Sequence, residues 1–218
     1  MTIAFLQEEL EAIYGVRAPR VGEFLVDREG ARRSGGGDPL APEVLFVRES
    51  VEGLELGLFL DAEVIDAADR TDPHDPRPRL TTPSTLPRLA CAAEGVSHFV
   101  YLSTRAAAGR PVSLLELEVQ AEVDKWALLV LHLWRRGLRK LSPALRRRLF
   151  ERVRYRQHLL DEELERYRLA NRLGGGYARW LEDRYVQGAD VDGLLRELRA
   201  TYRLGGGEKI GYLGARAQ

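Results

Sequence analysis

The segment VSLLELEVQAEVDKWALLVLHLWRR, residues 112–136, decides the fold class. Apolar and polar residues alternate strictly over residues 115–124, a period that by itself indicates a β-strand. A capping box points the other way, because Ser113 can cap a helix start and Glu116 follows three residues later. Together with the high Leu, Glu, Gln and Ala content, this box predicts a helix over residues 114–136.

Helical signals continue on both sides of this segment. Residues 85–108 have helical spacing, with Ser84 as the predicted N-cap and Gly109 after the end. Ser142 and Pro143 start a further, long helix, since serine caps and proline suits the first helical turn. The core positions of this helix continue from Leu160 to Tyr185. A last helix is predicted over residues 191–204. These helices form a predicted bundle of four to five members.

The N-terminal part has a different pattern. A helix is predicted first, and three strand-like stretches follow, the last two joined by a hairpin loop. The predicted helix covers residues 3–14, and the predicted strands cover residues 21–26, 44–48 and 54–60. We therefore predict an α+β fold that is predominantly α, with a small N-terminal helix and a three-stranded antiparallel sheet before the helical bundle.

Four prolines between residues 67 and 84 indicate a linker between these two parts. The predicted organisation follows from this division. It comprises a small α+β unit over residues 1–66, a proline-rich linker over 67–84, a helical bundle over 85–204 and a C-terminal tail over 205–218.

Composition excludes several classes of protein. The 218 residues are 44% hydrophobic and 30% charged, so the chain can bury a core without a disulfide or a metal. Equal numbers of basic and acidic residues, 33 of each, give no net charge that would steer the chain to nucleic acid or membrane. Cys91 is the one cysteine, the N-terminus lacks signal-peptide features, and the longest apolar run, residues 126–134, is too short to cross a bilayer. We therefore expect a cytoplasmic protein without membrane association.

Carboxylate and imidazole side chains recur at helical spacing on two successive predicted helices. Glu94 and His98 are four residues apart on the first helix, and Glu118 and Glu122 repeat that spacing on the second. Side chains four apart share a helix face, and two antiparallel helices with such pairs can hold a metal ion. Glu122 falls within the apolar stripe of its helix, so its carboxylate must be paired, coordinated or protonated. The hypotheses are a divalent transition metal, ion pairs with some of the many arginines, and acid–base chemistry.

A basic segment extends over residues 135–156, with ten basic residues and one acid, Glu151. Such a patch can contact phosphate groups, whereas the alternative is a solvated basic face. The candidate contacts to phosphate or nucleic acid are Arg146, Arg147, Arg148 and Arg152.

Asn171 and Gly174 are predicted to mark a helix–helix contact. Both fall on a heptad seam that begins at Leu160 and passes through three consecutive glycines. An asparagine on such a seam fixes register, and a glycine allows two helices to approach closely. The partner is either another helix of this chain or a second molecule.

No nucleophile elbow, HExxH, Walker A or dinucleotide fingerprint occurs in the chain. The leading hypothesis is therefore a non-catalytic cytosolic binding or adaptor protein that acts through a helical surface, on a protein partner or by self-association. One alternative is a metal-binding helical-bundle enzyme or regulator that uses Glu94, His98, Glu118 and Glu122. The other is a nucleic-acid-binding protein that uses residues 135–156. No catalytic residue and no cofactor is assigned.

Overall fold

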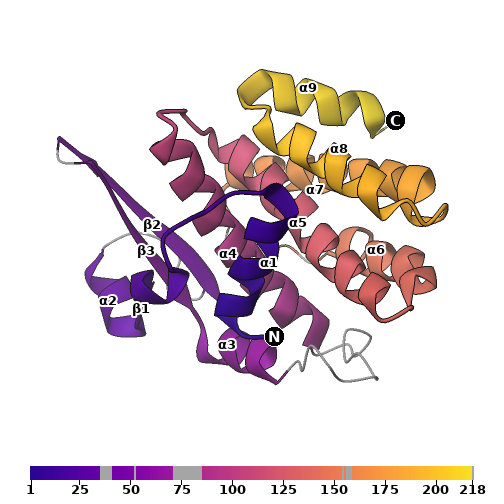
Figure 1. Ribbon diagram of the computed structural model, residues 1–218. Coiled ribbons are helices and arrows are strands. Elements are labelled where there is room, and N and C mark those ends of the chain that lie inside the picture. Colours follow the sequence, from indigo (N-terminus) through magenta and orange to yellow (C-terminus); the bar gives the residue numbers. More distant parts are fainter. Residues whose placement is uncertain (35–40, 52, 71–84, 154, 156–158, 218) are drawn as a thin grey trace. The chain divides into compact units, whose positions relative to one another are not determined.

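The structure is a computed structural model (Figure 1) and describes residues 1–34, 41–51, 53–70, 85–153, 155 and 159–217. Its fold is α+β and predominantly α, as predicted. The chain divides into two compact units. Unit 1 contains Met1–Ala12 and Val16–Pro111, and unit 2 contains Ile13–Gly15 and Val112–Gln218. Most of the predicted linker, together with the predicted cap Ser84, lies outside the described residues.

Unit 1 contains a small sheet, and helices come before and after its strands along the sequence. Its elements are α1 (Ile3–Tyr14, whose last two residues belong to unit 2), η1 (Val21–Phe24), β1 (Leu25–Val26), α2 (Arg28–Arg33), β2 (Glu43–Ser50), β3 (Gly53–Leu60), α3 (Ala62–Asp69) and α4 (Thr85–Ala107). Helix α4 was predicted as part of the bundle, and it packs here against β2, β3 and α3. The β2–β3 hairpin extends beyond the helices of this unit (Figure 1).

The sheet has the order β1-β3-β2 and is mixed, so the prediction of an antiparallel sheet was wrong. β2 and β3 form the expected antiparallel hairpin, but β1 runs parallel to β3, with Leu25 opposite Leu58. Alternating polarity predicts which residues form a strand, but the direction depends on the connection between strands. The predicted first strand is also short, because Val21–Phe24 forms a 3₁₀ helix.

Helix α4 lies close to the sheet because Gly95 has no side chain. A Cβ atom there would come within 2.7 Å of Glu43 Cγ and 2.9 Å of Leu60 Cδ2. The end of β3 is buried at this contact, including Leu58 and Leu60. This contact brings Glu43, at the start of β2, next to the middle of α4.

All regular elements among the described residues of unit 2 are helices. Its elements are α5 (Leu114–Arg135), η3 (Arg139–Leu141), α6 (Ser142–Phe150), α7 (Asp161–Leu181), η4 (Glu182–Val186, a π-helix that continues α7), α8 (Val191–Arg203) and α9 (Gly206–Arg216). Helix α5 is the central element and packs against α6, α7 and α9. Ser113 caps it as predicted, since its side chain accepts a hydrogen bond from the Glu116 backbone.

Two predictions for this unit need correction. The long helix predicted from Ser142 is two helices, because α6 ends at Phe150 and α7 begins at Asp161. Three acidic residues in the first turn of α7 favour a new helix start, because the amino end of a helix attracts negative charge. The predicted C-terminal tail forms α9, whose buried side chains Lys209 and Leu213 hold it against the unit.

The seam through the glycines of α7 includes a close contact with α5. A Cβ atom at Gly174 would lie 2.5 Å from Glu122 Cβ on α5, so only glycine permits this spacing. Helix α7 continues through all three glycines, as the heptad phase predicts. Among the described helices none is long and apolar enough to cross a bilayer.

Candidate functional site

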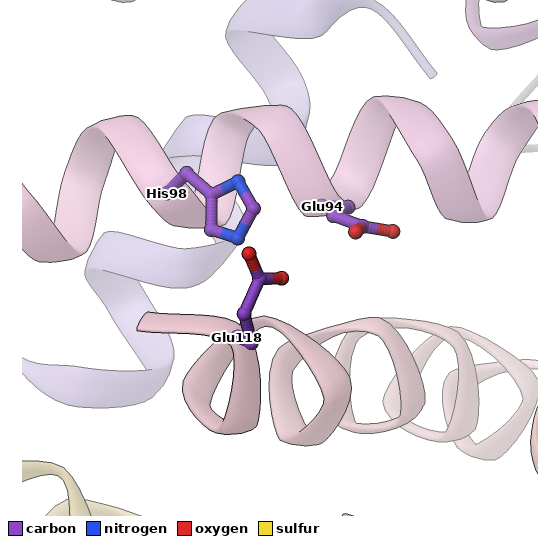
Figure 2. Close-up of side chains that lie close together, drawn as sticks. All are labelled: Glu94, His98 and Glu118. Atoms are coloured by element: carbon purple, nitrogen blue, oxygen red, sulfur yellow. The ribbon is translucent and has the colours of Figure 1, made fainter. Parts of the chain in front are cut away.

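The four residues of the predicted metal site are divided between the two units. Glu94 and His98 belong to α4 of unit 1, and Glu118 and Glu122 belong to α5 of unit 2. Figure 2 shows that the side chains of Glu94 and His98 leave α4 on the same side, one turn apart. The predicted pairing of these two residues on one helix face is therefore present in unit 1.

His98 lies against a carboxylate that sequence reasoning did not connect with it. Its Nδ1 atom is 3.3 Å from Oε1 of Glu43 on β2, and both side chains are about nine-tenths buried or more. Gly95 makes this contact possible, since any larger residue there would collide with Glu43. No signal in the local sequence links Glu43 to His98, because the contact depends on how the sheet packs on α4.

In unit 2, Glu122 is paired. Its carboxylate lies 3.0 Å from Nζ of Lys125, and both side chains are about one-eighth exposed. The expectation that Glu122 needs a partner is met by this ion pair within α5. Glu118, on the same helix, is buried.

Only one of the candidate basic residues lines a cavity. Arg146 is largely buried and forms ion pairs with Glu182 on η4, at 3.0 Å, and with Glu151, at 3.3 Å. Arg147 and Arg152 are exposed, and Arg148 is half-buried. The basic segment is therefore partly neutralised by acids of unit 2, and its last part includes residues outside those described.

Asn171 makes a hydrogen bond within unit 2. Its Nδ2 donates to the backbone oxygen of Phe150 at 3.0 Å, which ties α7 to the end of α6. The sequence left open whether Asn171 contacts this chain or a second molecule, and this hydrogen bond lies within the chain. Its Oδ1 atom is buried and has no hydrogen-bond partner.

A cavity of about 580 Å³ opens between α6, α7, η4 and α9 of unit 2. We call it the arginine pocket. Its lining residues are Arg146, Phe150, Glu151, Asn171, Arg172, Gly175, Gly176, Arg179, Trp180, Asp183, Arg216 and Ala217. A volume of this size is typical of small-molecule sites.

Two glycines of α7 shape this pocket. A Cβ atom at Gly175 would lie 2.9 Å from the Phe150 ring, and one at Gly176 would lie 2.4 Å from Ala217 Cβ. The ends of α6 and α9 therefore approach α7 at these two residues. The arginine pocket lies where the three helices meet.

The charge of the pocket is unbalanced. Its lining has four arginines but only two acids, Glu151 and Asp183. Arg146 is already paired, but no ion pair or hydrogen bond engages Arg172 or Arg179 among the described residues. The two are seven residues apart on α7, which puts them two turns apart on one helix face. Both face the cavity and both are exposed, so they are available to an external anion.

Arg216 of α9 also lines the pocket. Its guanidinium lies 3.5 Å from the centroid of the Tyr212 ring and 5.0 Å from that of Trp180. Its buried Nε atom has no hydrogen-bond partner and lies 3.9 Å from Glu197 Oε1. Its Nη1 atom donates a hydrogen bond to the backbone oxygen of Tyr212 at 3.3 Å, and ring stacking also fixes the orientation of the guanidinium.

A buried carboxylate holds Arg146, one of the lining residues. Glu182, the first residue of the π-helix, accepts hydrogen bonds from Ser142 Oγ and Arg146 Nε of α6. Its side chain is almost fully buried. A π-helical turn within a helix is rare and occurs frequently at functional sites. Here it displaces Asp183 and the following turn relative to the α-helical path of α7.

A second polar cluster of unit 2 is closed to solvent. Lys209 is fully buried and its Nζ donates to Gln120 Oε1 at 2.6 Å, while Gln120 Nε2 donates to Asp124 at 2.7 Å. Tyr14 also donates to Asp124, and burial together with that carboxylate raises the pKa of the Tyr14 hydroxyl well above its usual value. This cluster joins α9 and Tyr14 to α5 and lines no part of the arginine pocket.

Sequence reasoning identified Arg146 and Asn171 of this site but missed the unpaired arginines. Arg172 belongs to the motif RLGGG at residues 172–176, which recurs at residues 203–207. Two short copies are too few to predict a repeat architecture. Arg216 was assigned to a tail. Comparisons of the chain with models of known protein families, with curated proteins and with solved structures find no match.

Proposed function

We propose that this chain is a non-catalytic binding protein that takes a small anionic ligand in the arginine pocket of unit 2. The single observation that carries the proposal is the pair Arg172 and Arg179, which face one cavity and have no acidic partner among the described residues. The sequence predicted binding through a helical surface without locating it. The proposal assigns that binding to the arginine pocket and to an anionic ligand.

The geometry favours an anion with several oxygen atoms. A guanidinium presents planar N–H donors that match a phosphate or a carboxylate in a bidentate contact. Two such groups on one helix face, together with the guanidinium of Arg216 on the same lining, can contact one anionic group. Glu151 and Asp183 on the lining repel excess negative charge, so they favour a compact anion over a long polyanion.

The lining also favours binding over catalysis. Among its described residues there is no histidine, cysteine, serine, threonine, tyrosine or lysine. The pocket therefore lacks the common nucleophiles and a group that titrates near neutral pH. The lining contains two carboxylates and four arginines. This excess of arginines suits the binding and orientation of an anionic ligand.

Isothermal titration calorimetry with pyrophosphate as the probe tests this proposal at low ionic strength. The unmodified chain should bind about one equivalent, and raising the salt concentration should weaken the affinity, because the contact is between charges. The Arg172→Ala/Arg179→Ala variant should bind at least 10-fold more weakly.

The matched control is Arg184→Ala/Arg196→Ala, which removes the same charge from exposed arginines of unit 2 that do not line the pocket. It should bind pyrophosphate like the unmodified chain. Equal weakening in both double variants would show that net charge, not the pocket, attracts the probe. No saturable binding to the unmodified chain would refute the proposal.

A further inference from the structure

His98 of unit 1 has carboxylates near its ring from two different elements. Glu43 reaches it from β2, at 3.3 Å from Nδ1, and Glu94 precedes it by one turn on α4. His98 is 5% exposed, so its imidazole is removed from bulk water. The buried carboxylate of Glu43 beside a buried imidazole is a costly arrangement unless a positive charge is present.

Glu43 is placed to fix the tautomer of His98. A carboxylate only accepts at neutral pH, so a contact with Nδ1 puts the imidazole proton on that atom. The lone pair of the neutral ring is then on Nε2. Metal-binding histidines commonly have this outer carboxylate, which orients the ring and raises its basicity as a ligand.

Glu94 supplies a second donor on the same helix. One of its carboxylate oxygens lies within 4.8 Å of a ring nitrogen of His98, a separation that one metal ion can bridge. Residues four apart on a helix face can bind one ion together, as the paired histidines of zinc-binding helices do. Both side chains leave α4 on the same side in Figure 2.

We infer that Glu94 and His98 hold a divalent transition metal of the zinc and cobalt class, with Glu43 as the positioning residue behind His98. Imidazole and carboxylate donors are typical ligands of these ions, and water can fill remaining coordination positions. This inference goes beyond the proposed function, which uses residues of unit 2 alone. An ordinary ion pair between His98 and its neighbouring acids is the competing explanation.

The test is a cobalt titration of the full chain after treatment with a chelator. Visible absorption of Co²⁺ reports nitrogen and oxygen ligands, and elemental analysis gives the stoichiometry. The unmodified chain should bind about one equivalent. His98→Asn and Glu94→Gln should each abolish the saturable spectrum, and Glu43→Gln should weaken binding by about 10–100-fold, as expected for an outer-shell partner.

The control is His132→Asn, which removes a buried histidine of unit 2 and should leave the cobalt spectrum unchanged. Circular dichroism without metal verifies that each variant is folded, and Glu94→Gln keeps the test decisive if His98→Asn does not fold. Absence of saturable cobalt binding, or equal binding by Glu94→Gln and the unmodified chain, overturns the metal site. Unchanged affinity in Glu43→Gln overturns the positioning role. Pyrophosphate titration in the same variants should be unaffected, which separates this inference from the proposed function.

Discussion

At the residue scale, two groups of polar side chains in unit 2 differ in their partners. Lys209, Gln120, Asp124 and Tyr14 bond to one another and hold α9 to α5. Arg172 and Arg179 have no such partner and face a cavity. Because a buried polar group is costly unless it is bonded, stability explains the hydrogen bonds of the first group. The two arginines are exposed and unpaired among the described residues, so they remain available to an external anion.

Tyr14→Phe should lower the free energy of unfolding by about 1–3 kcal/mol, because Asp124 loses a donor in a buried environment. Burial of the ring and its stacking on Tyr202, at 4.0 Å between centroids, are retained in this variant. Urea unfolding of the variant and the unmodified chain measures the difference. A loss below about 0.5 kcal/mol would show that the hydroxyl contributes little to the cluster.

His132 should make stability depend on pH. Burial, with Arg136 and Arg135 nearby, lowers its pKa from 6.5 to about 4 in the folded chain. Between these values the unfolded chain takes up the proton and the folded chain does not, so stability is complete above pH 6.5 and falls as the pH drops toward 4. The total loss should be about 2 kcal/mol, after allowance for solvent screening.

Urea unfolding at several pH values checks this slope. The His132→Gln variant should have a flatter dependence between pH 6.5 and 4, whereas Tyr14→Phe should shift the whole curve without changing its slope there. An unchanged slope in His132→Gln would assign the pH dependence to other groups.

At the element scale, glycine decides how closely the helices of unit 2 pack. Gly174 faces Glu122 Cβ of α5, whereas Gly211 of α9 has no atom within 4 Å of the place where a Cβ would be. The two residues have the same intrinsic cost in a helix but opposite surroundings. They therefore form a matched pair for a test of the α5–α7 contact.

Gly211→Ala should stabilise the chain by about 0.5–1 kcal/mol, because alanine is the better helix former and meets no neighbour. Gly174→Ala should destabilise it by about 1–3 kcal/mol, because α7 must move away from α5. Thermal unfolding of both variants measures the two signs. Stabilisation by both substitutions would contradict the close α5–α7 approach.

Most helices were predictable because their signals are local. The Ser113 cap, the apolar spacing of α4 and the heptad phase of α7 each depend on neighbouring residues. The parallel direction of β1 and the helical state of α9 were not predictable, because long-range packing determines them. The arginine pocket was missed for the same reason, since Arg172 and Arg216 meet only after α7 and α9 pack.

At the scale of the whole molecule, the chain enters unit 2 twice, at residue 13 and again at residue 112. Residues 13–15 belong to unit 2, although the rest of the N-terminal part belongs to unit 1. Tyr14 stacks on Tyr202, and the Ile13 backbone oxygen accepts a hydrogen bond from Arg199 at 2.7 Å. Unit 2 is therefore incomplete without a short piece of the N-terminal sequence.

A fragment of residues 112–218 should consequently be much less stable than unit 2 in the full chain. It lacks the buried Tyr14 side chain, and loss of a large aromatic side chain costs about 3–5 kcal/mol. Thermal unfolding followed by circular dichroism compares the fragment with the full chain. Tyr14→Ala in the full chain should reproduce most of the loss of stability. A fragment as stable as the full chain would contradict the assignment of residues 13–15 to unit 2.

The most direct test of the anion site is an NMR titration of arginine side-chain Nε–Hε signals with pyrophosphate. The arginine pocket predicts saturable shifts at Arg172 and Arg179 and unchanged signals at Arg184 and Arg196, which lie outside the pocket. Small shifts of equal size at all arginines, without saturation, would contradict a specific site in unit 2.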